Sequence, residues 1–461
     1  MSAAKNPDAT RGAASEPILG PGPAEARPAM ARDTYRRSLV VVLVIASLLR
    51  ISILAFWPLP PVVLDAAEYD TAARRLLAVG SYAFPQGTQA PLTGAAFSAF
   101  IARKPNGGQM PGYPLFLAAI YRVLGTGPER VVAVAWVQAL LGVLTVLLTA
   151  ACVRRTGSRR EALAAALIAA LYLPFVWVGN AMLTQTLYTL ALAGVAYLGL
   201  RAIHDRSLWW FAALGAALAL SSYVRPETLP WAVVLFAVAL AFSAPDIGWR
   251  AALAQWLPGF AVACAVVLAL LAPWAARNAV IYHRFVPFGT YNSAPSNDFD
   301  RIALHLPPLE LDPRLDSYQA GTAVASAHRA LVSGLSPQTK VRLYALRGWE
   351  SARSWLVPFD PTWTYTRLGT GAAATRTLWF VLPQVALVAF ACVGVWAGRR
   401  RVGVLALASV PVYFLVLHAA TYPASVYAQP SMAAMIGLAG IGSVAMAGRL
   451  RRRRLPRLPA A

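Results

Sequence analysis

Charge is scarce in this sequence, and acidic charge is scarcer still. Only 13% of the 461 residues are charged, while 58% are hydrophobic. Soluble domains carry about 25% charged residues, so the composition argues against a soluble enzyme of this length. The 41 Lys and Arg residues outnumber the 19 Asp and Glu residues and give a net charge of +22. In a soluble protein such a charge would suggest a nucleic-acid partner, so the positions of the charges must decide its meaning.

Cysteine and histidine are also rare. The three cysteines lie far apart in apolar stretches, at Cys152, Cys264 and Cys392. We expect them to be buried small hydrophobic residues rather than a disulfide framework. No two of the five histidines have metal-ligand spacing such as H-x-x-x-H, which argues against a zinc site built from histidine.

Long apolar runs dominate what is present. A helix needs roughly 20 apolar residues to cross the hydrocarbon core of a membrane. Ten runs approach that length: 38–57, 129–153, 161–178, 182–200, 208–223, 228–244, 252–275, 377–397, 403–419 and 428–447. They predict an all-α polytopic membrane protein with about 10 transmembrane helices.

The same pattern divides the chain into segments. Residues 1–31 have almost no bulky apolar side chains and cannot bury a core. We therefore predict a disordered cytoplasmic tail (1–37), an amino-terminal transmembrane module (38–275) with a first long loop (58–128), a second long loop (276–376), carboxy-terminal transmembrane helices (377–447) and a basic cytoplasmic tail (448–461). Both long loops are expected to lie on the outer face of the membrane and to carry juxtamembrane helices.

The basic residues predict the orientation. Short loops that would be cytoplasmic hold ten Arg residues, and short outer connections hold one, Arg225. Lys and Arg in short loops set the orientation of a membrane protein, so most of the net charge reflects topology. The basic run Arg449–Arg454 follows a predicted span directly and is expected to bind anionic membrane lipid rather than nucleic acid.

Polar residues concentrate outside the membrane. The predicted spans are nearly free of ionisable groups, with Arg50 as the exception. A transporter is expected to carry polar residues at the middle of the membrane. Acidic, aromatic and polar residues instead gather in the two long loops and at the outer ends of the spans. This distribution is typical of an enzyme that acts at the outer membrane surface on a lipid-linked substrate.

The first loop contains a candidate acid–base group. Apolar spacing predicts a short surface helix from Ala66 to Val79. Asp65, Glu68 and Tyr69 share one face at its start. Two interpretations stay open. Asp65 and Glu68 have the spacing of a capping box, and a carboxylate held ionised at a helix amino terminus could also act as a general base.

Basic residues outside the membrane are candidates for holding a phosphate group. Arg103 and Lys104 precede the turn Pro111–Pro114, and they would either contact a lipid phosphate or form a loose charge pair. Arg225 either serves a site, pairs with Glu227 or is a snorkelling membrane anchor. Arg277 would either contact the phosphate or be an interfacial residue next to an aromatic belt.

Together these motifs resemble a known family. The motifs of this chain that carry the resemblance are Asp65-x-x-Glu68-Tyr69, Gly80-x-Tyr82, Pro111-Gly112-Tyr113-Pro114, Arg225-Pro226-Glu227 and Pro273-Trp274-x-x-Arg277-Asn278. In this order, from about residue 38 to 447, they resemble the bacterial GT-C superfamily of glycosyltransferases. The branch containing the protein O-mannosyltransferases and the lipid A aminoarabinose transferase is the most similar.

The resemblance implies a function and a location. Family members transfer a sugar from a polyprenyl-phosphate donor, so the resemblance implies inverting transfer to a hydroxyl group of a glycan, lipid or protein. It also implies a multi-pass protein of the bacterial cytoplasmic (inner) membrane with its active site on the periplasmic or extracellular face. The family's catalytic acidic position falls on Asp65, with Asp70 as a less favoured neighbour.

The resemblance also assigns supporting roles. The candidates for the donor phosphate are Arg277, Arg225, Arg103 and Lys104, and the supporting residues are Glu68, Tyr69, Tyr113, Glu227, Asn278 and Tyr427. A divalent metal ion shared by Asp65 and Glu68 is left open. Independently of the resemblance, the second loop is expected to fold over the site and recognise the acceptor; its Tyr291, Asn292, Asp298 and Asp300 are polar enough to bind sugar, although each taken singly is more typical of a solvated loop.

The chain departs from the family pattern at three charged positions. Gln109 stands where many relatives have Arg, Gln185 where many have Glu, and Val426 where an Arg commonly precedes the Tyr. Two other classes stay in view, and the losses at Gln109 and Gln185 suggest the second of them. One is a lipid or polysaccharide transporter, and the other is a non-catalytic assembly subunit of envelope glycan synthesis.

Overall fold

The computed structural model describes residues 30–290, 294–312, 315–356, 381–423 and 425–454, and every regular element within them is a helix. The first helices are α1 (Arg32–Phe56), α2 (Asp65–Val79), α3 (Gly94–Ile101), α4 (Gly112–Leu124), α5 (Arg130–Thr156), α6 (Arg159–Leu171), α7 (Leu173–Val178), α8 (Thr184–Asp205), α9 (Leu208–Val224) and η1 (Pro226–Thr228). Next come α10 (Trp231–Ile247), α11 (Trp249–Tyr282), α12 (Ala294–Ala303), α13 (Ser317–Gly334), α14 (Pro337–Leu356), α17 (Leu382–Gly398), α18 (Val402–Ala420), α19 (Ser425–Ala428), η3 (Gln429–Ser431) and α20 (Met432–Arg454).

Seven helical segments in the described residues are long and apolar enough to cross a membrane. They contain α1, α5, α8, α10, α11, α18 and α20. The runs predicted at 208–223 and 377–397 form the shorter apolar helices α9 and α17. The run predicted at 161–178 divides into α6 and α7, because Pro174 cannot continue a helix and the preceding turn holds Tyr172 in an extended conformation. The prediction of an all-helical polytopic membrane protein is confirmed, but the number of ten spans is not.

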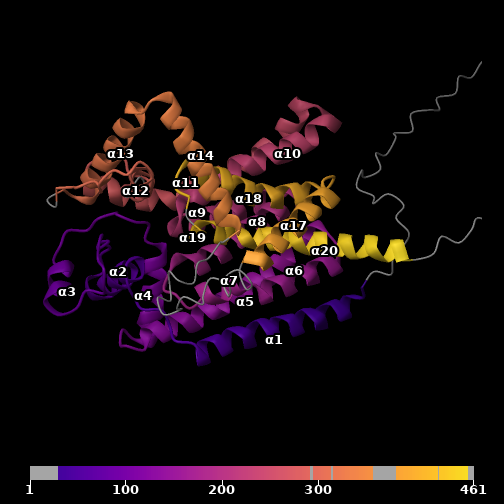
Figure 1. Cartoon of the computed structure of the whole chain (residues 1–461), viewed down its shortest axis with the longest axis horizontal. Helices are drawn as coiled ribbons and strands as arrows, with labels where there is room; N and C mark the ends of the chain where they lie inside the picture. The colour runs from indigo at the N-terminus through magenta and orange to yellow at the C-terminus, as the bar shows by residue number, and fades with distance from the viewer. Residues whose placement is uncertain (1–29, 291–293, 313–314, 357–380, 424, 455–461) are drawn as a thin grey trace, which may run out of the picture.

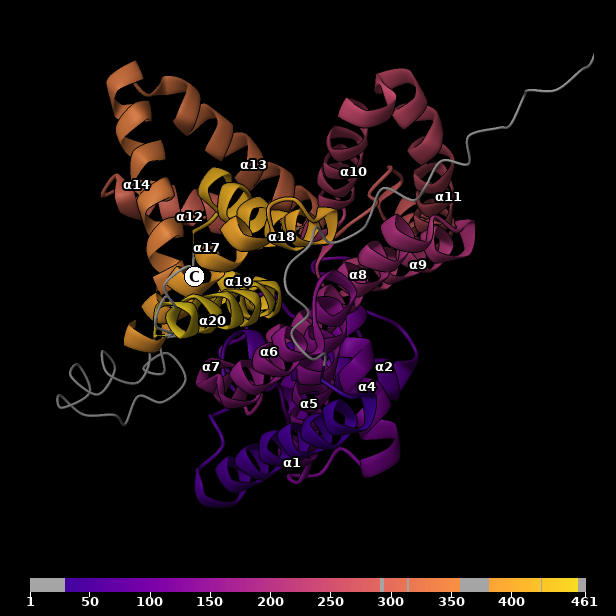
Figure 2. The same ribbon diagram turned by 90° about the vertical axis from the view of Figure 1, so that its right-hand side faces the viewer.

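The long helices run roughly side by side along the bundle (Figure 1). The amino end of α1 and the carboxyl end of α20 lie at one end, and α2, α3, α12 and α13 lie at the other. Viewed after a quarter turn, α5, α6 and α8 occupy the middle, with α1 on one side and α17, α18 and α20 on another (Figure 2). The two loop regions predicted to face outward therefore share one end of the molecule.

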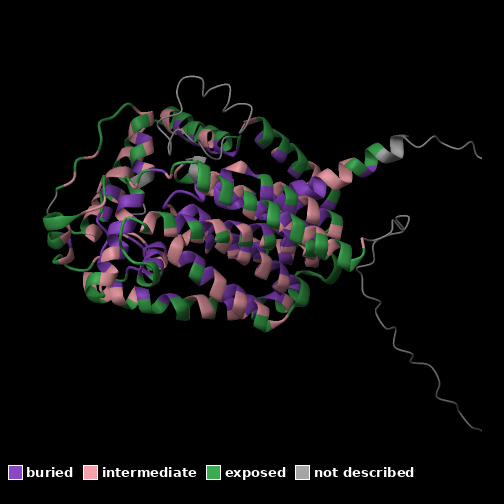
Figure 3. Ribbon diagram, turned by 90° about the horizontal axis from the view of Figure 1, so that it is seen from below, coloured by how far each residue is buried: buried purple, intermediate pink, exposed green. Residues whose placement is uncertain are grey.

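Small residues let the central helices approach closely. A Cβ atom on Gly394 of α17 would lie 2.0 Å from the Leu438 carbonyl oxygen of α20, and one on Gly442 would lie 1.9 Å from the carbonyl oxygen of Phe390. Close backbone contact through small residues is the usual packing device of membrane helices. Buried residues accordingly line the interior of the bundle, and exposed residues cover its outside (Figure 3).

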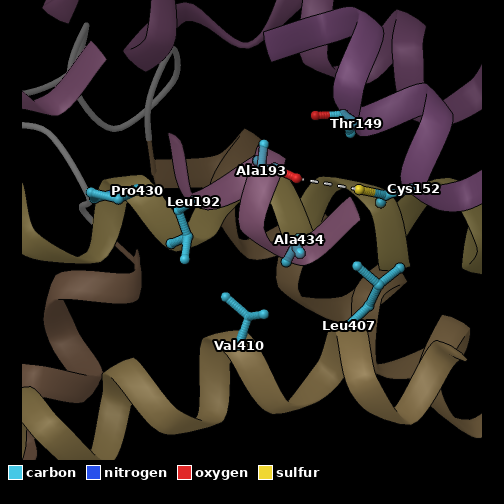
Figure 4. A pocket seen from close by; sticks show the side chains of 11 residues that line it. Thr149, Cys152, Leu192, Ala193, Leu407, Val410, Pro430 and Ala434 are labelled. Carbon is cyan, nitrogen blue, oxygen red and sulfur yellow. Dashed lines mark hydrogen bonds between the residues drawn. The ribbon is translucent and has the colours of Figure 1, made fainter. Parts of the chain in front are cut away.

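A small apolar cavity lies inside the described part of the bundle. It has a volume of about 10 Å³, lies among α5, α8, α18 and α20 and is lined by apolar side chains such as Leu192 and Val410 (Figure 4). Cys152 Sγ donates to the carbonyl oxygen of Ala193 across it at 3.7 Å. A volume of this size holds at most one water molecule. The cavity therefore reflects packing and holds no ligand site.

Several helices extend past their predicted ends. Helix α1 begins at Arg32, inside the tail predicted for 1–37, and α20 continues to Arg454. Helix α11 continues to Tyr282, past the predicted boundary at 275. Residues 1–29, 357–380 and 455–461 lie outside the described residues. Arg50, the charged residue of the first span, is buried, and its Nη1 donates to the carbonyl oxygen of Ala46.

A buried ion pair joins two helices of the second loop, and its arginine also bonds to the bundle. Asp300 of α12 is fully buried and accepts from Arg347 Nε of α14 at 2.8 Å and from Nη2 at 2.5 Å. Arg347 Nη1 also donates to the carbonyl oxygen of Ala420, the last residue of α18. His328 Nε2 of α13 lies 2.8 Å from Asp300. This network leaves Asp300 no exposed surface for an acceptor, which contradicts the role predicted for it.

The other three loop residues predicted to bind the acceptor have different outcomes. Asp298 is exposed, and its Oδ1 accepts from the side chain of Asn297. Tyr291 and Asn292 lie outside the described residues.

Candidate functional site

The candidate site begins at the amino end of α2. Leu64 precedes the helix with a φ of +53°, a left-handed conformation that is rare for a branched residue and costs of the order of 1–3 kcal/mol. Neither carboxylate of the first turn caps the helix. Asp65 is already the first helical residue, and Glu68 Oε1 accepts from the backbone N–H of Gly87 at 2.5 Å. The capping-box interpretation is therefore wrong. The surrounding tertiary structure, and not helix capping, determines the positions of both side chains.

Aromatic packing fixes α2 against the neighbouring helices. Tyr69 is buried, with its ring centre 5.7 Å from that of Phe84 and 5.0 Å from that of Tyr113. Tyr113 is fully buried in the first turn of α4 and donates its hydroxyl to Gln138 Oε1 at 3.0 Å. Edge-on aromatic contacts of this kind stabilise a fixed geometry. They set the position of Asp65 and Glu68 relative to α4 and α5.

Close backbone contact brings the end of α9 to the same place. A Cβ atom on Gly112, the first residue of α4, would lie 2.5 Å from the backbone of Tyr223. Helix α9 ends at Val224, because Pro226 disfavours a helical conformation in the residue that precedes it, Arg225. That residue, Arg225, is extended, with φ −151° and ψ 122°. The sequence Arg-Pro thus ends the helix and turns the arginine into the site.

Arg225 is the centre of a network drawn from four segments. Its Nε donates to Thr184 Oγ1 of α8 at 3.0 Å, and its Nη1 lies 3.7 Å from Glu227 Oε1. Its guanidinium carbon lies 4.5 Å from the centre of the Tyr427 ring of α19. The Arg225 charge also acts on Asp65, whose carboxyl pKa it lowers. The structure thus brings Asp65, Glu68 and Tyr69 of α2 together with Arg225, Glu227 and Tyr427.

His418 of α18 belongs to the same network and was missed by sequence reasoning. It is 3% exposed, its ring stacks at 5.5 Å from that of Tyr427, and its Nε2 lies 3.8 Å from Glu227 Oε2. This distance exceeds that of a direct hydrogen bond. Neither ring nitrogen has a hydrogen-bond partner among the described residues. The available signal was a histidine at the outer end of an otherwise apolar run.

The two carboxyl groups of α2 have shifted pKa values. Asp65 is exposed, yet the surrounding protein removes enough water to raise its carboxyl pKa, while the Arg225 charge lowers it. Desolvation and the neighbouring Asp65 raise the pKa of Glu68 to about 7, against the lowering effect of backbone N–H groups of Gly87 and Thr88. A carboxylate that titrates near neutral pH beside another is a common feature of acid–base sites.

Arg225 stays charged in this environment. Desolvation lowers its pKa, but the Glu227 carboxylate and nearby tyrosines raise it, and their effect is the larger. The site therefore combines a permanent cation with a carboxylate whose protonation responds to pH. Such a pair can accept a proton on one side and stabilise a negative charge on the other.

Asp70 has a different role from Asp65. It is fully buried, and its Oδ1 accepts from the Tyr121 hydroxyl at 2.8 Å and from Arg130 Nε at 2.7 Å. Its Oδ2 accepts from Arg74 Nε at 2.9 Å. These bonds join α2 to α4 and α5 and occupy the carboxylate. Asp70 is thus the centre of a buried ion-pair network.

Arg277 and Asn278 hold the first loop to α11. Arg277 Nη2 donates to the carbonyl oxygens of Tyr82 at 2.7 Å and Asn106 at 3.1 Å, and Nη1 donates to Asn278 Oδ1 at 3.0 Å. Asn278 is fully buried and donates in turn to the carbonyl oxygens of Val286 and Phe288. Most hydrogen-bonding capacity of Arg277 is thus directed to the protein itself.

The remaining predicted residues lie in less constrained positions. Arg103 and Lys104 are exposed, and neither side chain has an ion-pair partner within the described part of the chain. Gln109 contributes its backbone carbonyl, which accepts from the Tyr82 hydroxyl at 3.1 Å. Gln185 is 4% exposed, and its Oε1 has no hydrogen-bond partner among the described residues.

Metal ligation has no further support in the geometry. Among the described residues, no group of three or more His, Cys, Asp or Glu side chains could hold a metal ion. Asp65 and Glu68 supply two carboxylates, and the Arg225 guanidinium acts electrostatically on Asp65. A metal ion shared by these two residues stays an untested prediction.

Comparison with known proteins supports a membrane glycosyltransferase. Residues 104–276 match the family described as dolichyl-phosphate-mannose-protein mannosyltransferase. The matched region runs from Lys104 through α4 to α11 and includes Arg225 and Glu227. No curated protein sequence matches the chain.

Solved structures give the fold. The oligosaccharyltransferase of Archaeoglobus fulgidus, tethered with an acceptor peptide, aligns over 92% of this chain with a TM-score of 0.54 and 14% identity. The chain has a GT-C fold. It spans about half the length of that enzyme, 51% in this alignment. The same archaeal protein, AglB, in complex with an inhibitory peptide and a dolichol-phosphate aligns over 93% of this chain and 52% of its own, with a TM-score of 0.51 and 14% identity.

ArnT from Cupriavidus metallidurans bound to undecaprenyl phosphate aligns over 93% of this chain and 82% of its own, with 15% identity and a TM-score of 0.43. The resemblance predicted from the motifs is confirmed by the family match and by the GT-C fold.

Proposed function

We propose that the protein is an inverting glycosyltransferase that moves a sugar from a polyprenyl-phosphate donor to a hydroxyl group of a lipid, polysaccharide or protein. The observation that carries the proposal is that the exposed Asp65 carboxylate at the start of α2 lies within the electrostatic influence of the charged Arg225, at one end of a GT-C bundle. The description of the matching family names a dolichyl-phosphate-linked mannose donor, and the AglB structure contains a dolichol-phosphate. Both support a lipid-phosphate donor for this chain.

In the proposed reaction, the acceptor hydroxyl oxygen attacks the anomeric carbon from the face opposite the phosphate. Its proton passes to an Asp65 carboxylate oxygen, a general-base role. The bond from the anomeric carbon to the phosphate oxygen breaks, and the polyprenyl phosphate leaves with the electron pair. One glycosidic bond forms and one phosphoester bond breaks, with inversion at the anomeric carbon.

Arg225 is the best-placed cation for the leaving phosphate. Negative charge grows on the phosphate in the transition state, and a positioned cation stabilises it. Thr184, Glu227 and Tyr427 fix the Arg225 guanidinium, so little reorganisation is needed during the reaction. Arg103 and Lys104 are proposed to contact the donor phosphate further from the reacting carbon, and Arg277 is proposed to position the loop that follows α2. Tyr69 and Tyr113 shape the wall beside the carboxylates.

The proposed site faces the periplasm or cell exterior of a bacterial cytoplasmic membrane. The end of the bundle that carries Asp65 also carries the two long loops. The excess of Arg in the short connections at the other end supports a cytoplasmic location for that end.

Replacing Asp65 by Asn tests the proposal. The full-length protein in detergent is given a radiolabelled polyprenyl-phosphate sugar and a panel of acceptors. Asp65→Asn should lose most of the transfer, about 100-fold or more, because the amide cannot take the acceptor proton. Asp246→Asn, which changes an exposed Asp at the end of α10, is the matched control and should retain full transfer. Near-full transfer by folded Asp65→Asn would overturn the assignment of the base.

The same assay distinguishes the other functional classes. Proteoliposomes that move a lipid-linked sugar without forming a glycosidic bond would establish a transporter. Donor binding without transfer across the whole acceptor panel would indicate a non-catalytic assembly subunit, the alternative suggested by Gln109 and Gln185.

A further inference from the structure

A basic recess lies at the end of the bundle opposite α2. It forms where the carboxyl ends of α5 and α8 meet the amino ends of α6 and α18, and its volume is about 820 Å³. Helix α5 connects the two ends of the molecule, because Arg130 at its start bonds to Asp70 and Arg154 near its end lines the recess. The 27 residues of α5 span roughly 40 Å. The recess is therefore distinct from the Asp65 site.

Positive charge prevails in the recess. Arg154, Arg155, Arg401 and His204 line it, and Glu161 is the acidic residue among the lining groups. Glu161 is occupied by the capping box of α6, in which its Oε2 accepts from the Ser158 N–H at 2.5 Å. Its contact with Arg401 Nη1 is long, at 3.5 Å. One engaged carboxylate thus faces three arginines.

The adjacent acidic residue does not neutralise this excess. Asp205 pairs with Arg201 Nε at 2.7 Å, and its contact with Arg155 Nη1 is longer, at 3.5 Å. Arg201 therefore balances Asp205. Arg154 and Arg401 are both exposed, so their guanidinium groups can reach a ligand without losing a buried bond.

Aromatic residues beside the recess mark the level of lipid headgroups. The ring of Trp210, in the first turn of α9, stacks on the Arg201 guanidinium. The guanidinium carbon lies 3.9 Å from the ring centre. The neighbouring Trp209 is 73% exposed on the outer surface of the bundle. Exposed tryptophans at the ends of membrane helices lie at the interface between hydrocarbon and water. A phosphate in the recess would then lie at the depth of the phospholipid headgroups.

We propose that this recess binds the phosphate headgroup of an anionic phospholipid. Basic pockets between helix ends at the membrane surface provide the charge-assisted hydrogen bonds that such headgroups accept. A bound lipid would join the ends of α5, α6, α8 and α18 and stabilise the bundle. Free phosphate or a soluble phosphate ester shares the chemistry but lacks the acyl chains that the interfacial position would hold.

The test is lipid binding to the full-length protein by native mass spectrometry in detergent. Three probes are titrated: phosphatidylglycerol, phosphatidylcholine and inorganic phosphate. Phosphatidylglycerol should bind more tightly than phosphatidylcholine, and inorganic phosphate at the same concentration should not compete with it. Each arginine removed should weaken phosphatidylglycerol binding by about fivefold, so Arg154→Gln combined with Arg401→Gln should weaken it by about 25-fold.

The matched control is Arg37→Gln combined with Arg250→Gln, which removes two exposed arginines outside the recess lining. It should bind phosphatidylglycerol like the unmodified protein. Equal loss in both double variants, or equal binding of the two phospholipids, would overturn the proposal. Competition by inorganic phosphate at equal concentration would overturn the lipid as the source of the phosphate. Should the double recess variant fail to fold, the single variants, each with its fivefold loss, provide the measurement. The readout does not depend on sugar transfer.

Discussion

The Arg225 guanidinium stacks on the Tyr427 ring at 4.5 Å, although one residue lies before α10 and the other after α18. The contact joins the part of the chain that matches the mannosyltransferase family, residues 104–276, to a segment outside it. Tyr427 takes part in the site through α19, whose four residues sit between α18 and η3. The carboxy-terminal helices are therefore needed to complete the candidate site.

Arg225→Lys tests the geometry of this cation. Lysine keeps the charge but loses the Nε bond to Thr184 and the planar stacking on Tyr427. We expect kcat/KM for the lipid-linked donor to fall by about tenfold or more, the value of one lost charge-assisted hydrogen bond. Steady-state kinetics with varied donor measures it. Arg122→Lys, at an exposed position of α4, is the control, and equal kinetics in the two variants would remove Arg225 from the site.

Glu68 predicts a pH-dependent stability. The folded state raises its pKa to about 7 from an ordinary value of 4.5, so the folded protein holds this proton more tightly than the unfolded chain does. Stability should therefore decrease as the pH rises from about 4.5 to about 7 and then level off. Glu68→Gln removes this contribution. The difference in Tm between the two proteins should change across that pH range, and a constant difference would contradict the assigned pKa.

Asp70→Asn should affect folding instead of chemistry. Asparagine keeps the shape but leaves Arg74 and Arg130 without their buried counter-charge. Removing one partner of a buried ion pair costs about 3 kcal/mol. Denaturation with SDS in mixed micelles should show this loss of unfolding free energy. Tyr121→Phe removes one hydrogen bond to the same carboxylate and should cost about 1 kcal/mol. Similar unfolding free energies for Asp70→Asn and the unmodified protein would argue against the structural role.

Much of the fold follows from local sequence. Apolar runs of sufficient length predict membrane helices because the interior of a membrane cannot satisfy free backbone groups. The break between α6 and α7 at Tyr172 is also encoded locally, because Pro174 follows it. A hydropathy average over a long window does not detect a single residue of this kind. Arg225 could be selected because its charge opposes the orientation bias of the other short connections.

Local sequence patterns could not distinguish the role of Asp65 from that of Asp70. Both are carboxylates on α2, and only tertiary structure places Arg130 against one and Arg225 near the other. The prediction of a capping box was wrong for the same reason, because the partner of Glu68 is the backbone N–H of Gly87 in a later turn, which donates to its carboxylate. His418 carries no motif, and its relation to Glu227 arises only when α18 packs beside α10.

Gly112→Ala tests the close contact between α4 and α9. The added methyl group would lie 2.5 Å from the Tyr223 backbone, which cannot move as a side chain can. Overpacking of this kind costs about 1–3 kcal/mol, and the shift of α9 should also displace Arg225 and lower kcat. Gly348→Ala in α14 is the matched control, because nothing lies within 4 Å of its added Cβ. It should raise stability by up to about 1 kcal/mol. Thermal unfolding of both variants measures the contrast, and a stable, fully active Gly112→Ala would refute the contact.

Arg277→Gln separates positioning from donor binding. The structure directs Arg277 to Asn278 and to the carbonyl oxygens of Tyr82 and Asn106, which hold the loop that follows α2. Loss of these bonds should loosen the loop, so we expect kcat and Tm to fall together while the KM for the lipid-linked donor changes by less than about threefold. Arg277→Lys should restore part of the Tm, since an ammonium can still donate to one carbonyl. A large increase in donor KM with unchanged Tm would instead identify Arg277 as a direct contact of the donor phosphate.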